Sequence, residues 1–75
     1  MQGSIIEYLF NAIFNNLVGD VRRFIAKAQA NEKLRKNFLR SLSVEAQGVN
    51  GSMAEYVRNE LTERFEVKTD FFISV

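Results

Sequence analysis

The architecture of this 75-residue chain follows from one segment near its start, Ile5-Ile6-Glu7-Tyr8-Leu9-Phe10-Asn11-Ala12-Ile13-Phe14-Asn15-Asn16-Leu17-Val18. Its large apolar residues occupy two adjacent positions in every four, which is typical of an α-helix because a β-strand requires strict alternation. They cover about 220° of the helix circumference, roughly twice the stripe of an ordinary amphipathic helix. We therefore expect a helix from Ile5 to Val18 that is covered on two sides, either by later helices or by a second copy.

The length and composition predict one small domain, residues 1–75, that gains stability by self-association. A chain of 75 residues is near the size at which a single core leaves little net stability. The sequence has no Cys and no His, which excludes disulfides and the usual zinc sites. Oligomerisation remains as the source of additional stability. We therefore expect a homo-oligomer, with a dimer favoured.

The first apolar segment is too short and too polar on one face to span a bilayer, which requires about 20 apolar residues. It is a poor signal peptide as well, because no Lys or Arg precedes it and Glu7 interrupts it. We expect a cytoplasmic protein. Association with a membrane surface is a second alternative, since a basic segment follows the apolar one, but the polar face of the first helix carries no cation.

The middle of the chain predicts further helices. Gly19-Asp20 indicates that a new helix begins near Asp20, because Gly disfavours helix interiors and Asp caps helix starts. Residues 21–42 contain no Pro or Gly and are rich in helix formers. A single helix would place Arg35 inside its apolar face. One bent helix and two helices separated at Ala30-Asn31, with Asn31 as the second cap, are therefore equally consistent with the pattern.

The remainder predicts a loop, a helix and a strand. Gly48-Val49-Asn50-Gly51 indicates a loop, and Ser52-Met53-Ala54-Glu55 fits a capping box that opens a helix. From residue 65 to residue 75 apolar residues alternate with polar ones, as in a strand, whose partner would be residues 42–46 or another copy. The predicted fold class is mainly α, with three to four amphipathic helices and a short C-terminal β-strand, completed by oligomerisation.

The residue inventory argues against an enzyme. The absence of His and Cys removes the commonest general base, the thiolate nucleophile and the usual transition-metal ligands. Carboxylates remain at Glu60, Glu63 and Glu66, but basic neighbours would keep them charged. We predict no catalytic residue, no cofactor and no metal site.

Charge is segregated along the chain. Residues 20–42 carry a net charge of +5 and residues 43–75 a net charge of −3. A basic helix lying near an acidic one explains this most simply. A regulator that binds the nucleic-acid backbone is the alternative, since five cations would fall within about 140° of a continuous helix: Arg22, Arg23, Lys33, Lys36 and Arg40. Against it, no aromatic residue falls among these cations within that arc for base stacking.

We interpret the chain as a non-enzymatic protein-protein interaction or assembly module, an adaptor or regulator that self-associates through its apolar N-terminal helix and also contacts an unidentified protein partner. Five residues are the candidates for the self-association surface: Ile6, Tyr8, Phe10, Phe14 and Leu17. If Phe10 and Phe14 are buried, replacing either with Ala costs about 3 to 5 kcal/mol.

Overall fold

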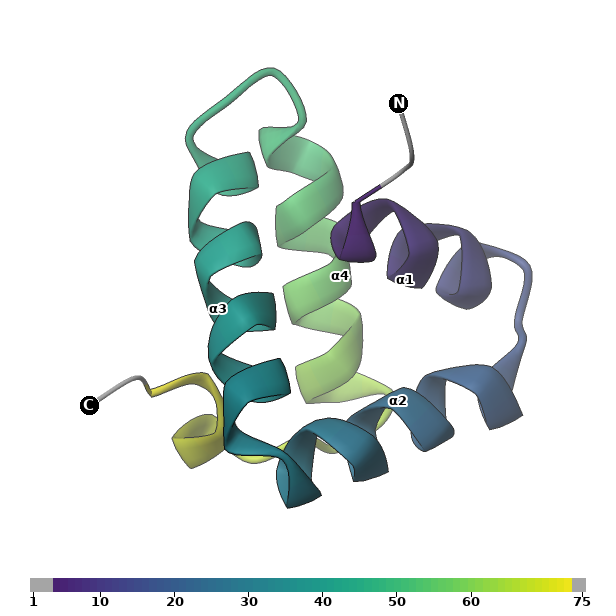
Figure 1. The fold of residues 1–75 in the computed structure, drawn as a ribbon. Helices are drawn as coiled ribbons and strands as arrows, with labels where there is room; N and C mark the ends of the chain where they lie inside the picture. Colours follow the sequence, from purple (N-terminus) through teal and green to yellow (C-terminus); the bar gives the residue numbers. More distant parts are fainter. Residues whose placement is uncertain (1–3, 74–75) are drawn as a thin grey trace.

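Helices form all of the regular structure within residues 4–73, the part of the chain that the computed structural model describes. Within these residues the elements are α1 (Ile5–Phe14), α2 (Val18–Ala30), α3 (Glu32–Ala46), α4 (Gly51–Glu63) and the short 3-10 helix η1 (Thr69–Phe72). The helices α3 and α4 lie side by side and antiparallel, while α1 and α2 lie across them (Figure 1). The prediction of a mainly helical chain is confirmed.

The helix α1 contributes one side to the core and contacts α2, α3 and α4. Its buried residues are Ile6, Leu9, Ala12 and Ile13. They join the buried apolar residues of the other elements: Val21, Phe24, Ile25, Ala28, Phe38, Leu39, Leu42, Ala54, Val57, Leu61, Phe65, Val67 and Phe71. The later helices therefore cover one broad side of α1, with Ile5 and Phe10 half-buried against the core and Tyr8 and Phe14 left exposed.

The helix α1 ends earlier than the apolar pattern predicted. Asn16 has a left-handed φ of 60°, and the backbone N–H of Leu17 donates to the carbonyl oxygen of Ala12 at 2.8 Å. This is the hydrogen-bond pattern of a Schellman cap, with Asn at the position that Gly usually holds. The break thus falls at residues 15–17, and Gly19 lies in the first turn of α2 instead of ending α1.

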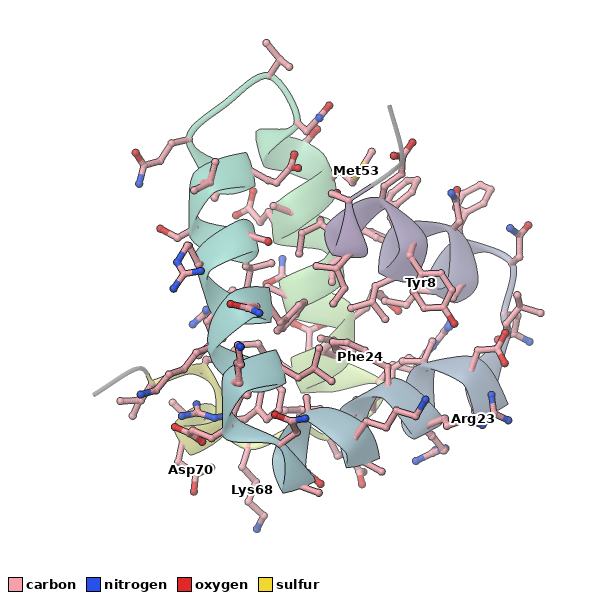
Figure 2. All side chains as sticks on the ribbon, in the orientation of Figure 1. Tyr8, Arg23, Phe24, Met53, Lys68 and Asp70 are labelled. Atoms are coloured by element: carbon pink, nitrogen blue, oxygen red, sulfur yellow. The ribbon has the colours of Figure 1, made fainter. Side chains whose placement is uncertain are left out.

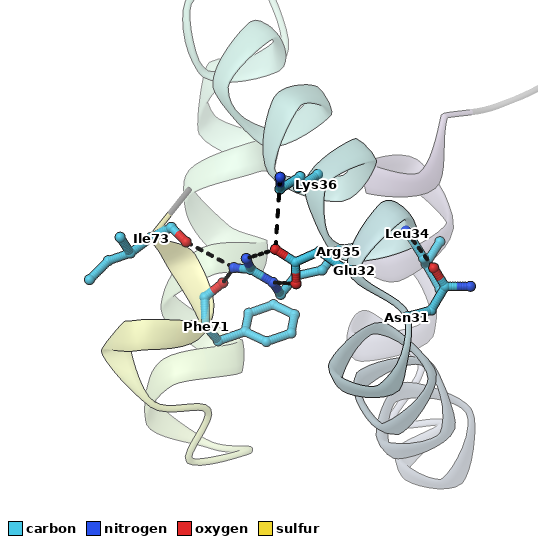
Figure 3. A network of polar contacts seen from close by, with 7 residues as sticks. All are labelled: Asn31, Glu32, Leu34, Arg35, Lys36, Phe71 and Ile73. Carbon is cyan, nitrogen blue, oxygen red and sulfur yellow. Dashed lines mark hydrogen bonds and ion pairs between the residues drawn. The ribbon is translucent and has the colours of Figure 1, made fainter. Parts of the chain in front are cut away.

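The basic middle of the chain forms two helices, which settles the alternative that the sequence left open. The side-chain oxygen of Asn31 accepts a hydrogen bond from the backbone N–H of Leu34 at 3.1 Å, so Asn31 caps the start of α3 (Figure 3). Because the helix is interrupted there, α2 and α3 need not share one apolar face.

The predicted capping box at Ser52 is wrong, although the predicted loop is present. The helix α4 begins at Gly51, and neither its N-cap Asn50 nor any other side chain caps it. The backbone N–H of Ala54 already donates to the carbonyl oxygen of Asn50 at 3.1 Å. Ser52 therefore lies inside the first turn, where its hydroxyl cannot act as an N-cap acceptor.

The predicted C-terminal strand is also wrong within the described residues, and residues 74–75 of that prediction lie outside them. After α4 the chain turns at Glu66, whose φ is 58°. It then forms η1, where the backbone N–H of Phe71 donates to the carbonyl oxygen of Lys68 at 3.0 Å. Local backbone hydrogen bonds order this segment without a partner strand, together with the hydrogen bonds that the Arg35 side chain donates to the carbonyl oxygens of Phe71 and Ile73.

Arg35 fastens the C-terminal segment to α3. Its side chain is only 12% exposed, and its Nη1 donates to the carbonyl oxygens of Phe71 and Ile73 at 2.7 and 2.9 Å (Figure 3). Its Nε and Nη2 donate to the Glu32 carboxylate at 3.2 and 2.7 Å. Arg35, which a single continuous helix would have placed inside its apolar face, thus contacts the C-terminal segment that contains Phe71 and Ile73.

An aromatic cluster lies beside this contact. Phe38 of α3 is fully buried, and its ring centroid lies 5.3 Å from that of Phe24 on α2 and 6.1 Å from that of Phe71 on η1. Pairs at these separations stabilise a fold beyond the area that they bury. The cluster joins three elements at one end of the bundle.

Removing the Arg35 guanidinium should destabilise the protein. We expect Arg35→Met to lower the free energy of unfolding by about 2 kcal/mol, because hydrogen bonds from charged donors contribute about 1.5 to 3 kcal/mol. Arg40→Met is the control, since Arg40 is exposed and its one side-chain hydrogen bond within residues 4–73 is to the nearby Asn37. Urea denaturation measures both, and equal unfolding free energies for the two variants would contradict the role given to Arg35.

The free energy of unfolding should decrease as the pH is lowered and Glu32 becomes protonated. Its hydrogen bonds to Arg35, with the Arg35 charge, lower the pKa of Glu32 below its ordinary value of 4.5. A lowered folded pKa gives stability that is present above the unfolded pKa and is lost as pH falls through the folded pKa. The melting temperature of the wild type should exceed that of Glu32→Gln above about pH 5, and the difference should shrink as pH falls below 4.5. A constant difference down to about pH 2.5 would contradict this.

Gly51 should be required by the close approach of α4 to the end of α3. A Cβ at Gly51 would lie 2.9 Å from the carbonyl oxygen of Ala46, whereas a Cβ at Gly19 would meet nothing closer than a side-chain nitrogen of Arg23 at 3.9 Å. We expect Gly51→Ala to destabilise by about 1 to 3 kcal/mol. Gly19→Ala should be neutral or stabilise by up to about 1 kcal/mol. Equal effects in denaturation experiments would show that the contact is not constraining.

Candidate protein interaction surface

One flank of α1 joins α4 and the loop before it in an apolar surface, the α1–α4 patch, which consists of Phe10, Phe14, Val49, Met53 and Tyr56. These residues, with Asn50 and Ser52, line a hollow of about 430 Å³. Figure 2 shows Met53 of α4 beside the N-terminal part of α1. The patch therefore combines side chains that are far apart in the sequence.

The aromatic side chains of the patch form a continuous group. The rings of Phe10 and Phe14, one helical turn apart, stack with centroids 5.9 Å apart, and Phe10 meets Tyr56 edge to face at 5.2 Å. Phe10 and Tyr56 are half-buried, but Phe14 is 69% exposed and Val49 is fully exposed. The expectation that Phe14 is buried is therefore wrong for a single copy.

The patch is uncharged. None of the residues that line its hollow is Asp, Glu, Lys or Arg, and the polar members are the neutral Asn50 and Ser52. An apolar floor with a neutral polar edge can be dehydrated without the cost of burying an ionic group. This favours a protein surface as the binding partner over a charged ligand.

The predicted self-association residues do not form one surface. Phe10 and Phe14 lie together in the patch, but Ile6 is fully buried in the core, where it cannot contact another molecule. Tyr8 lies on the opposite flank of α1 and lines a shallow hollow with residues of α2 (Figure 2). Leu17 follows the end of α1 and is 48% exposed.

Sequence reasoning missed Val49, Met53 and Tyr56 as members of the surface. Met53 appeared in the sequence as part of the predicted capping box, and in the structure it is half-buried on α4. The sequence does indicate Val49 as a candidate, because it is the one large apolar residue in the predicted loop Gly48-Val49-Asn50-Gly51. Only the packing of α4 beside α1 shows that these residues adjoin Phe10.

The five candidate nucleic-acid-binding cations are divided between two helices. Two lie on α2 and three on α3: Arg22, Arg23 and then Lys33, Lys36 and Arg40. The helical break at Asn31 removes the single arc on which they were expected to lie. Arg23 also pairs with Asp20 at 2.9 Å, and the Arg22 guanidinium lies 5.6 Å from the Phe65 ring centroid. Whether these cations bind phosphate stays a prediction.

Residues 4–73 contain neither a cluster of potential metal ligands nor a helix that could cross a membrane. Among residues 4–73 no three acidic side chains come together as potential ligands of one ion. No helix in the same range combines the length and the apolar character that crossing a membrane requires.

Comparison of the chain with models of protein families, with curated proteins and with solved structures finds no significant match.

Proposed function

We propose that this chain is a non-enzymatic protein interaction module that forms a homodimer through the α1–α4 patch. The observation that carries the proposal is the exposure of Phe14, 69% accessible and stacked on Phe10, beside the fully exposed Val49. Burying apolar surface stabilises an association by about 25 cal/mol per Å² before the costs of association are subtracted. Contiguous exposed apolar groups of this kind mark interaction surfaces.

The composition of the patch supports a protein partner. Aromatic residues and Met are enriched at protein interfaces, and charged residues are depleted at the interface centre. The patch holds three aromatic rings and Met53 and contains no charged residue. An aromatic group of this kind can supply the central anchor residues on which binding energy concentrates.

A second copy is the partner that the patch fits best. In a two-fold symmetric dimer the same surface faces itself, so any charge near the axis would meet a like charge. The patch avoids this because it has none. It also places a projecting side chain, Val49, next to a hollow lined by Phe10 and Phe14, so each copy can supply both a projection and a recess.

Dimerisation would give the module its role as an adaptor, regulator or assembly element. A dimer presents every other surface of the chain twice, which strengthens the binding of any partner that has two matching sites. A further protein partner and a cytoplasmic setting belong to the proposal.

Binding of the nucleic-acid backbone remains the alternative, and it rests on the net charge of +5 over residues 20–42. The division of the cations between α2 and α3 gives no single basic helix face to support it. The two functions differ in an observable, because backbone binding weakens steeply between about 50 and 200 mM salt, whereas an uncharged apolar interface does not.

Replacing Phe14 with a small polar residue should abolish self-association while the fold persists. Sedimentation equilibrium of the wild type should show a mass that rises from 8.6 kDa toward twice that value with concentration. We expect Phe14→Ser to raise the dimer dissociation constant at least about tenfold, a change of about 1.4 kcal/mol. Its circular dichroism should match that of the wild type, because Phe14 is outside the core.

Val44→Ser is the matched control, because Val44 is 67% exposed on α3 and does not line the patch. It should dimerise as the wild type does. A wild type that stays at 8.6 kDa up to about millimolar concentration would contradict the proposal, and so would a Phe14→Ser variant with an unchanged dissociation constant.

A further inference from the structure

Met53 places a sulfur atom in the α1–α4 patch. It lies in the first turn of α4, lines the hollow together with Phe10 and Tyr56, and is half-buried against the core (Figure 2). The chain has no Cys, and its other Met is Met1, which lies outside the described residues. Met53 is therefore the one side chain within residues 4–73 whose sulfur can be oxidised.

The hollow leaves Met53 within reach of a small oxidant. Asn50 and Ser52, which line the hollow beside it, are exposed, and Met53 itself keeps part of its surface accessible. Hydrogen peroxide oxidises a thioether by forming a bond between the sulfur and one peroxide oxygen, while the O–O bond breaks and water leaves. The product is methionine sulfoxide, so a flexible apolar side chain becomes a polar one.

The patch offers little to a sulfoxide oxygen once a partner covers it. Three of the lining side chains carry no hydrogen-bond donor: Phe10, Phe14 and Val49. The amide group of Asn50 already donates to the Glu45 carboxylate at 3.1 Å. The hydroxyls of Ser52 and Tyr56 remain as donors, but a new bond from a hydroxyl replaces one to water and gives little net stabilisation. Covering a sulfoxide here therefore removes its hydration without an equal return, which disfavours association.

We propose that the α1–α4 patch is a redox-sensitive contact, in which oxidation of Met53 to the sulfoxide prevents dimerisation. The inference rests on the proposed function and deepens it, because it names a means of regulating the same surface. Peroxide acts on the free chain, since a second copy would cover Met53, and the oxidised chain then stays monomeric. Methionine sulfoxide reductases return the side chain to the thioether, so the change is reversible.

Sedimentation equilibrium before and after peroxide treatment tests the proposal. The full chain is treated with hydrogen peroxide below its dimer dissociation constant, and peptide mass spectrometry verifies that Met53 has gained one oxygen atom. We expect oxidation to raise the dimer dissociation constant at least about fivefold, because burial of a poorly satisfied polar group opposes association. Treatment with methionine sulfoxide reductases should restore the original value.

Two variants complete the experiment. Met53→Leu keeps an apolar side chain of similar size, so it should dimerise as the wild type does and should not respond to peroxide. It retains Met1, so it also reports any effect of oxidising that residue. Met53→Gln introduces a polar side chain of similar length, and without peroxide it should raise the dissociation constant at least about fivefold.

The results separate this inference from the proposed function. A wild type that dimerises equally well before and after oxidation of Met53 would overturn the inference and leave the dimer standing. Equal loss of dimer by peroxide-treated Met53→Leu, or a Met53 that resists peroxide when free methionine is oxidised, would do the same. An untreated wild type that stays at 8.6 kDa would overturn both proposals.

Circular dichroism of the oxidised chain gives the last check. The spectrum should match that of the untreated chain, because the inference places the effect of the sulfoxide at the surface between copies. An oxidised chain that unfolds would overturn the inference, since Met53 would then act through the core against which it packs.

Discussion

The packing of Phe38 between Phe24 and Phe71 is the contact on which the rest of the structure depends. It joins α2, α3 and η1 at one end of the bundle, which no disulfide can close because the sequence has no Cys. Arg35 lies one turn before Phe38 on the same helix and holds the carbonyl oxygens of the segment that carries Phe71. The helix α1 buries one side in the core, and Tyr8 and Phe14 on its two flanks stay exposed.

The helices could be predicted from sequence because their signals are local. The apolar spacing of α1 and the capping side chain of Asn31 each act within one or two helical turns. The structure of the C-terminal segment could not be predicted from sequence, because a strand and a packed turn can both bury every second side chain and so have the same sequence pattern. Val67 and Phe71 are buried as alternation requires, but the backbone between them bonds locally. The sequence placed Arg35 on an apolar helix face without a visible reason, because its hydrogen-bond partners are 36 and 38 residues away.

The interaction surface was predictable only in part, for a related reason. The spacing of Phe10 and Phe14 puts them on one flank of a helix, and that follows from sequence. Which flank the later helices cover does not follow, so Ile6 was assigned to the surface although it is buried. Tyr56 and Val49 join the patch only because α4 packs beside α1 and the preceding turn ends there. A contact between distant segments has no periodic signature.

Isotope-filtered nuclear Overhauser measurements on a mixture of labelled and unlabelled chains test most directly whether two copies meet through the α1–α4 patch. We expect contacts between copies from the Val49 methyl groups to the rings of Phe10 and Phe14, which two-fold symmetry would bring together. Contacts between copies that involve only Val44 or Ile73, which are exposed but outside the patch, would contradict it. A concentrated sample with no contacts between copies would contradict it as well.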